Sequence, residues 1–127
     1  MSDLSAIFTL AAAVVRTSGH GKGRFVGPDG TVDAVGALST AVTGKATPPD
    51  VIDGLLWDAV EYLSPRIPSM TVDEDPLERI ADWNDQSETT QADVIAALEA
   101  ASADAAEAAI AHVDAIATHH TSSLAVA

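Results

Sequence analysis

The C-terminal third of the chain constrains the fold most strongly. From Thr90 to about Thr118 the sequence has neither proline nor glycine and is dominated by alanine, the residue with the highest helix propensity. Thr90 followed by Asp93 is typical of a capping box, with the acid one methylene shorter than the usual glutamate. These features predict one long helix that begins after Thr90 and ends near Thr118.

This predicted helix has an apolar side and an acidic side. At about 100° per residue, one side carries Val94, Leu98, Ala101, Ala105, Ala109, Val113 and Ile116. The opposite side carries Asp93, Asp104, Glu107 and Asp114. Because alanine buries little area, we expect the apolar side to be held by close approach of another helix. That helix is either part of the same chain or belongs to a second copy, which leaves a homodimer through the alanine-rich helix as an alternative.

Shorter apolar patterns predict further helices upstream. Their spacing is helical, and their starts carry capping residues or proline, as at Asp75-Pro76. The predicted ranges are about 3–16, 34–42, 47–63 and 76–83, the third beginning at Thr47-Pro48-Pro49. Two short β-type runs around Gly27-Pro28-Asp29-Gly30 predict a small β-hairpin near 24–32.

The fold class that follows is mainly α. We expect a compact bundle of about five helices with one small β-hairpin, ending in the long alanine-rich helix. Residues 1–118 form a single helical domain with the hairpin near 24–32, and residues 119–127 form a frayed tail.

Two short motifs are expected to fix corners of the bundle. In Trp83-Asn84-Asp85, Trp83 should anchor the corner between the last two helices, and the polar pair should bind nearby backbone groups. Asp33 is placed to cap the second helix, in which Gly36 indicates close packing against another backbone. A functional alternative makes Trp83-Asn84-Asp85 part of a ligand or catalytic cleft.

The charge is strongly negative and unevenly distributed. The net charge is −13; it is +1 from Met1 to Thr47, −6 from Pro48 to Arg79 and −8 after Arg79, where the chain has no Lys or Arg. Direct binding to nucleic acid is disfavoured, because that affinity comes largely from Lys and Arg neutralising phosphates. Three interpretations of the acidity remain: general solubility or salt adaptation, docking on a basic protein, and mimicry of nucleic acid.

The sequence predicts no catalytic, cofactor or metal site. It has no cysteine, and its histidines are His20, His112, His119 and His120. The Gly-rich run at 20–23 lacks the pattern of a phosphate loop and is expected to be a mobile loop. No apolar run approaches the roughly 18 residues of a membrane span, so no membrane contact is expected and a cytoplasmic location is the default.

Two stretches resemble a small domain family of unknown function found in actinobacteria and their phages. Gly30-Thr31-Val32-Asp33-Ala34-Val35-Gly36-Ala37-Leu38 is similar to a Gly-x-x-Cys-Ala-Leu-Gly-Ala-Leu element, with Asp33 where the family often has cysteine. Trp83-Asn84-Asp85 with the following Thr90-x-x-Asp93 is similar to its Trp-Asn-Asp motif. The resemblance spans roughly Leu4 to Ala101. It implies a compact helical fold and a phage or mobile-element origin, and it supplies no activity.

The function expected from the sequence is a non-enzymatic, acidic protein-interaction module that binds a basic surface of another protein. Its contact surface is expected at Asp93, Asp104, Glu107 and Asp114, with the acidic connector at Asp73 to Asp75. The alternatives are a small-molecule-binding domain or enzyme with a cleft near Trp83-Asn84-Asp85, and a nucleic-acid mimic that occupies a DNA- or RNA-binding protein.

Overall fold

The computed structural model describes residues 3–68 and 75–126, and the side chains of the last helix as far as Ile110. Within these residues the protein is mainly helical, which confirms the predicted fold class. The elements are α1 (Asp3–Ser18), α2 (Ala34–Thr43), α3 (Gly54–Leu63), the 3-10 turn η1 (Ser64–Arg66), α4 (Pro76–Asp85) and α5 (Gln91–Val126). No helix in the described ranges is both long and apolar enough to cross a membrane.

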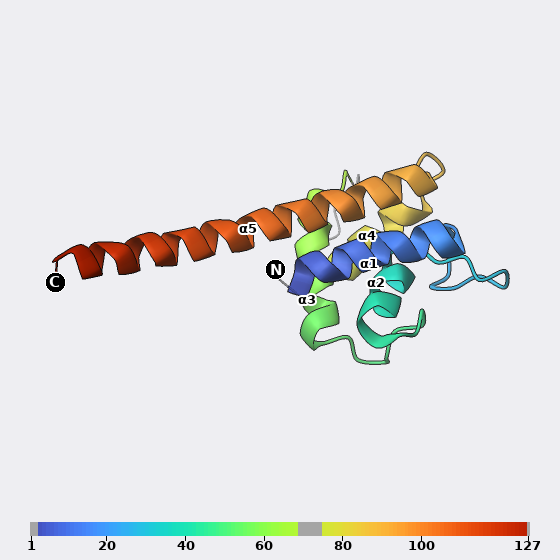
Figure 1. Cartoon of the computed structure of the whole chain (residues 1–127). Coiled ribbons are helices and arrows are strands. Elements are labelled where there is room, and N and C mark those ends of the chain that lie inside the picture. Colours follow the sequence, from blue (N-terminus) through green and yellow to red (C-terminus); the bar gives the residue numbers. More distant parts are fainter. Residues whose placement is uncertain (1–2, 69–74, 127) are drawn as a thin grey trace.

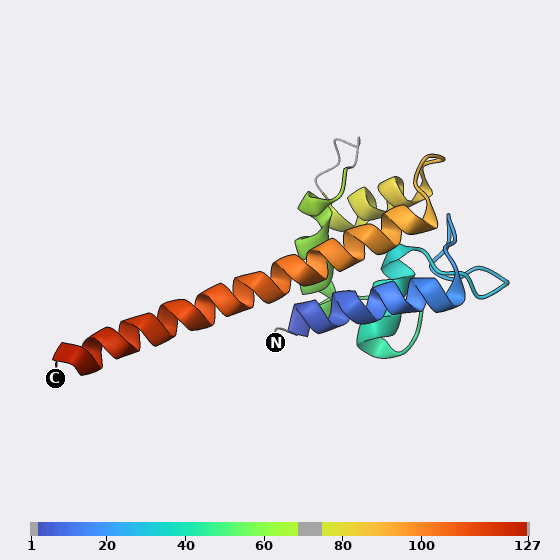
Figure 2. The same cartoon turned by 45° about the horizontal axis from the view of Figure 1, so that its top comes forward.

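The long C-terminal helix is continuous, and its predicted start is confirmed. The Thr90 backbone N–H donates to the Asp93 carboxylate (2.9 Å), and the Asp93 N–H donates to the Thr90 hydroxyl (3.2 Å), which completes a capping box. α5 extends to Val126, beyond the predicted end near Thr118. Its second half projects away from the bundle (Figure 1), while its first half lies beside α1 in both views (Figures 1 and 2). The fraying of residues 119–127 stays a prediction.

The two sides of α5 are placed as predicted where side chains are described. Its alanine-rich face is buried against α1, and the acids at 93, 104 and 107 are exposed. Its buried apolar side chains are Val94, Leu98, Ala101 and Ala105. The helix that approaches closely is therefore α1 of the same chain along this part of α5.

The core lies between α1 and the layer formed by α2, α3 and α4. Each helix contributes bulky side chains that are fully buried, and Phe8 also lies against the Tyr62 ring, with centroids 5.7 Å apart. The largest of these side chains are Phe8 and Val15 of α1, Leu38 of α2, Val60 and Leu63 of α3, Ile80 of α4 and Leu98 of α5.

The predicted start of the third helix at Thr47 is wrong. α3 begins at Gly54, after Asp53 in an extended conformation, and Val51 is 71% exposed. The consecutive prolines account for the first part of the difference, because each proline pushes the residue before it, here Thr47 and Pro48, out of the helical region. Residues 44–53 consequently cross the surface as an irregular connection, although their apolar spacing looks helical.

The predicted β-hairpin is not present among the described residues. Val26 and Val32 form a single antiparallel bridge around the turn at 27–30, and Val32 forms a second bridge, parallel, with His20. Two constraints keep the strands from lengthening. The N–H and C=O groups of Val32 both bond to the segment around His20 (Gly19 C=O and Gly21 N–H), and Asp33 must already serve as the N-cap of α2.

Candidate functional site

The two motif stretches meet at one end of the bundle, where the loop 19–33, the start of α2 and the end of α4 come together. Asn84, only 1% exposed, lies at the centre of this cluster. Its Oδ1 accepts from the Ala34 backbone N–H (3.0 Å) and from His20 Nε2 (2.8 Å), so this ring nitrogen carries the proton. Its Nδ2 donates to the Gly21 carbonyl (3.1 Å) and to Asp85 Oδ1 (3.0 Å). One amide side chain thus joins three segments.

The glycine-rich loop is fastened to the end of α4 by further hydrogen bonds. The Gly23 N–H donates to Asp85 Oδ1 (2.8 Å), the His20 N–H donates to Gln91 Oε1 (3.1 Å), and Lys22 Nζ donates to the Gln86 carbonyl. These hydrogen bonds attach the loop to the end of α4, and its expected mobility stays a prediction. Sequence reasoning missed these contacts because nothing in either segment indicates pairing across more than sixty positions.

Trp83 lies at the corner between α4 and α5. Its side chain is 3% exposed, and its carbonyl accepts from the Thr89 hydroxyl (2.7 Å) and the Gln86 N–H (3.3 Å). The turn between the two helices is thus closed by its own polar groups, with the indole packed beneath it.

Asp33 caps α2 from a buried position. Its Oδ1 accepts from the Gly36 N–H (2.6 Å), and the residue is 6% exposed. Burial raises the pKa of this carboxyl to about 6, and the negative charge of Asp85 acts in the same direction, while the N–H groups of Gly36 and Val35 oppose the shift. Asp33 therefore titrates closer to neutrality than an ordinary carboxyl.

Gly36 allows the loop to lie directly on the first turn of α2. A Cβ atom at this position would stand 2.0 Å from the Phe25 carbonyl oxygen, which is far inside van der Waals contact. The same carbonyl accepts from the Asp33 N–H (3.3 Å). The close approach that the sequence indicates is therefore made by the loop backbone.

A groove of about 430 Å³ opens beside this cluster, between the loop and α4. Both acids of the cluster border it, with the exposed apolar side chains of Phe25 and Val26. It is lined by Gly23, Arg24, Phe25, Val26, Asp33, Thr47, Ala81 and Asp85. Trp83 instead borders a separate hollow of about 490 Å³ toward α5, and Asn84 is sealed inside. The motif residues therefore do not share one cavity.

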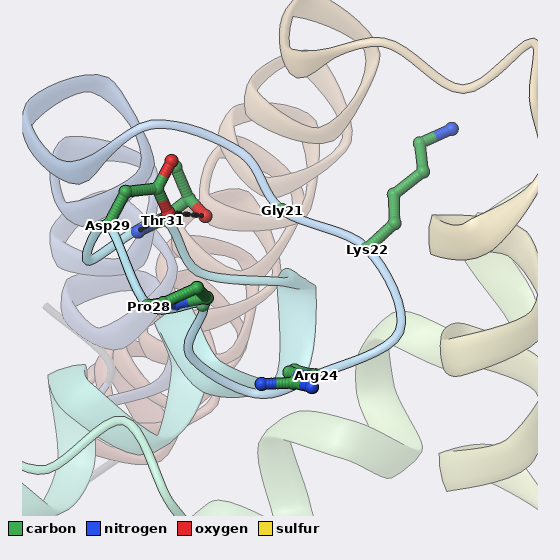
Figure 3. Close-up of a pocket in the computed structure, with 7 residues that line it drawn as sticks. Gly21, Lys22, Arg24, Pro28, Asp29 and Thr31 are labelled. Carbon is green, nitrogen blue, oxygen red and sulfur yellow. Dashed lines mark hydrogen bonds between the residues drawn. The ribbon is translucent and has the colours of Figure 1, made fainter.

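A third hollow, of about 480 Å³, lies within the loop itself (Figure 3). Lys22 points away from it, toward the connection that follows α4. On its other side the Asp29 carboxylate accepts from the Thr31 hydroxyl (2.8 Å), and hydrogen bonds from Thr31 lower the pKa of Asp29. A carboxylate on the wall and a lysine directed outward do not suit a phosphate group.

Two of the four acids expected to bind a partner on α5 are engaged within the chain. Asp93 caps its own helix, and Asp104 accepts from Arg66 Nε (2.7 Å) and the Tyr62 hydroxyl (3.1 Å). These hydrogen bonds lower the pKa of both carboxyls. Glu107 is exposed with no described partner, and Asp114 lies beyond the residues whose side chains are described. The acids Asp73 and Glu74 of the connector also lie outside the described residues.

A different set of acids is free on α4. Glu78 and Asp82 are exposed and form no hydrogen bond or ion pair with another described residue. With Asp85 they follow the spacing i, i+4, i+7, which places all three on one face of the helix. The sequence carries this signal, but isolated carboxylate pairs are so often solvated that spacing alone did not single it out. In the described ranges, no three potential metal-ligating side chains gather.

Fold and cluster together define a small, mainly α-helical domain in which two sequence motifs hold each other at one end of the bundle. The chain belongs to a family of unknown function, DUF6197, whose family model matches residues 1–104. The expected membership in a domain family of unknown function is thereby confirmed, whereas the motif details and the actinobacterial or phage origin stay predictions. No curated protein and no solved structure matches the chain. The matched region ends next to Ala105, the last buried residue of α5 in the described part.

Proposed function

We propose that this protein is a non-enzymatic, acidic protein-interaction module that binds a basic surface of another protein. The observation that carries the proposal is a set of exposed carboxylates on several helices without a partner among the described residues. These are Asp58 and Glu61 of α3, Glu78 and Asp82 of α4, Glu88 of the following turn and Glu107 of α5. Their charges are not neutralised within the described structure and remain available to a partner.

Two of the cations already form ion pairs within the chain. Arg16 pairs with Glu99, and Arg66 pairs with Asp104 and lies over the Tyr62 ring. A surface of one sign raises the association rate with an oppositely charged partner and makes binding sensitive to salt. General solubility would need only a net charge, whereas an interaction module needs particular carboxylates, and that difference can be measured.

The proposal includes the setting expected from the sequence, a cytoplasmic protein of phage or mobile-element origin. A homodimer remains a variant of it. Since the apolar side of α5 from Val94 to Ala105 is already buried in the chain, a second copy would have to use the later, projecting part of the helix.

The test is affinity capture from a bacterial lysate at low salt, followed by elution along a salt gradient. The control bait carries Asp58→Asn, Glu61→Gln, Glu78→Gln and Asp82→Asn. We expect the wild-type bait to retain a discrete basic protein that the neutralised bait loses. Retention of the same proteins by both baits, or of none, would contradict the proposal. A captured protein that is released by added duplex DNA would favour the nucleic-acid mimic.

A second candidate function is a ligand-binding domain or enzyme that uses the groove beside Asp85. The observation that favours it is the carboxyl pair, in which buried Asp33 has a pKa of about 6 and Asp85 borders the same groove. Two carboxyls in different environments can divide acid and base roles. A fragment screen by NMR tests this candidate: it requires a compound that shifts the Gly23 and Ala81 amides and loses affinity with Asp33→Asn.

A further inference from the structure

The groove between the loop and α4 has apolar side chains on the loop side and carboxylates at the α4 side. Phe25 and Val26 are each 38% exposed, and they lie next to each other on the loop side of the groove. Ala81 forms the α4 side of the groove. At about 430 Å³ the groove is large enough for one bulky side chain of a partner.

The carboxylates of α4 continue outward from this groove. Glu78 precedes Ala81 by three residues, and Asp82 and Asp85 follow it by one and four, so all lie on neighbouring positions of one helix face. From Glu78 to Asp85 the face runs roughly 10 Å along the helix axis. That distance matches two successive turns of a partner helix, on which cations recur at the same spacing.

The opposite wall has the opposite charge. Arg24 lines the groove from the loop side, Asp85 borders it from α4, and Asp33 borders it at the start of α2. A basic segment therefore has one favourable orientation, with its cations toward α4 and away from Arg24. Charge complementarity thus points to a basic occupant and also fixes how it lies.

We propose that this groove takes one apolar side chain of a basic, amphipathic helical segment of a partner protein, whose lysines or arginines pair with Glu78 and Asp82. This inference rests on the proposed function and narrows its contact surface from carboxylates of several helices to those of α4. The anchor in the groove supplies specificity, and the flanking carboxylates supply charge pairing. Acids elsewhere, including Asp58 and Glu61, then contribute only to the general field of the protein.

The experiment uses the full chain and a synthetic helical peptide of lysine, leucine and alanine, titrated at low salt and followed by backbone NMR. We expect the peptide to shift the amides of Gly23, Phe25, Ala81 and Asp82. A second peptide of equal charge, with alanine in place of each leucine, should bind at least about fivefold more weakly, because it lacks the anchor.

Matched variants separate local pairing from net charge. The double variant Glu78→Gln/Asp82→Asn should weaken binding about tenfold, which corresponds to roughly 1.4 kcal/mol. Asp58→Asn/Glu61→Gln removes the same charge from α3 and should weaken it less than about twofold, the effect of the general field alone. Arg24→Gln should tighten binding, since it removes the opposing cation. Unchanged melting curves establish that each variant is folded.

The outcomes distinguish this inference from the proposed function. Equal losses in the two double variants, or amide shifts centred on α3 or α5, would overturn the groove assignment and leave an acidic interaction module in place. Equal affinity for the two peptides would also overturn it, because no side chain would then occupy the groove. If neither peptide binds and the lysate yields no salt-sensitive partner, both ideas fail together.

Discussion

Two buried polar contacts join distant parts of this chain, and they are built differently. Asn84 connects α4 to the loop and to α2 through an amide that binds two backbone groups, Ala34 N–H and Gly21 C=O. Ser102 connects α5 to α1 through hydroxyls: its Oγ lies 2.6 Å from the Thr9 hydroxyl oxygen and 3.2 Å from that of Ser5, and it donates to the Ser5 carbonyl (2.9 Å). The residues at the centres of the two contacts are buried: Asn84 is 1% exposed and Ser102 is 9% exposed.

The difference lies in what remains when each side chain is removed. The backbone groups around Asn84 are outside regular structure or at a helix start, so no second partner is at hand. The Thr9 hydroxyl lies within α1, where it can turn to the Ser5 carbonyl one helical turn back, which Ser102 no longer uses once its hydroxyl is removed. We infer that the cluster at Asn84 specifies the fold, whereas the contact at Ser102 mainly fills space between closely packed helices.

The largest effect is expected for Asn84→Ala. Truncation leaves Ala34 N–H, Gly21 C=O and the His20 ring without their partner, and each unsatisfied buried group costs about 1–3 kcal/mol. Because His20 and Gly21 are half-buried and water can reach them, we expect a total loss of about 4 kcal/mol in the free energy of unfolding. Urea denaturation followed by circular dichroism measures it.

His20→Ala is the matched control for this prediction, because it removes one partner and leaves the other bonds of Asn84 intact. Its cost should be only about 1 kcal/mol. If Asn84→Ala lowers the free energy of unfolding by no more than this, the cluster contributes only as much as a surface hydrogen bond, and the contrast with Ser102 is removed.

Gly36→Ala tests the same region through packing and is expected to cost about 3 kcal/mol. Alanine in a helix interior is normally better than glycine by roughly 0.5–1 kcal/mol, so the sign of the change is informative. Here the new Cβ would stand 2.0 Å from the Phe25 carbonyl, and the backbone of the loop would have to move. Thermal unfolding decides the sign; a stabilised variant would mean that the loop does not rest on α2.

The sequence predicts the helices well where local chemistry decides them. Pro76 after Asp75, and Thr90 with Asp93, are strong local signals, and both helix starts lie where they indicate. Failures occur where local and distant terms compete. The apolar spacing after Thr47 looks helical, but the chain stays irregular as far as Asp53. The β-type residues around 27–30 stop at single bridges because Asp33 begins a helix.

The candidate site is harder to predict than the fold. Motif spacing indicates that Trp83-Asn84-Asp85 and Asp33 matter, but the partner of Asn84, His20, lies far away in sequence. Likewise the four acids predicted on α5 share a face by periodicity, yet only the structure shows that Asp104 already forms an ion pair with Arg66. Side-chain pairing between segments depends on the packing of the whole bundle, which a single sequence does not encode locally.

Asp33→Asn tests the burial of the cluster around Asn84 through the pH dependence of the free energy of unfolding. Asparagine can still accept from the Gly36 N–H, but it does not titrate. The folded pKa of Asp33, about 6, exceeds the unfolded value of 3.8, so the folded state binds the proton more tightly. The contribution of Asp33 to stability is therefore full below pH 4 and declines as the pH rises toward 6, by about 2–3 kcal/mol in all.

The measurement is the free energy of unfolding of both proteins from pH 4 to pH 7. The stability of wild type relative to Asp33→Asn should fall across this interval and level off above it. Asp29, Asp93 and Asp104 have lowered pKa values and act in the opposite direction, but they are common to both proteins and cancel in the difference. A constant difference would place Asp33 in an exposed, ordinary environment.

The smallest effect is expected for Ser102→Ala, within about 1 kcal/mol of wild type. The substitution removes hydrogen bonds to Ser5 and Thr9, each with a modest net value of about 1 kcal/mol. Two terms offset this loss. The Thr9 hydroxyl can bind the Ser5 carbonyl within α1, and alanine has the higher helix propensity in α5. Alanine also suits the close approach of α1, since Ala101 and Ala105 are buried on the same face.

The thermal and urea unfolding curves of Ser102→Ala should therefore nearly overlay those of wild type. A loss comparable to that of Asn84→Ala would show that the hydroxyl contact, too, specifies how the helices pair, and α1 and α5 would then depend on polar complementarity instead of on small side chains.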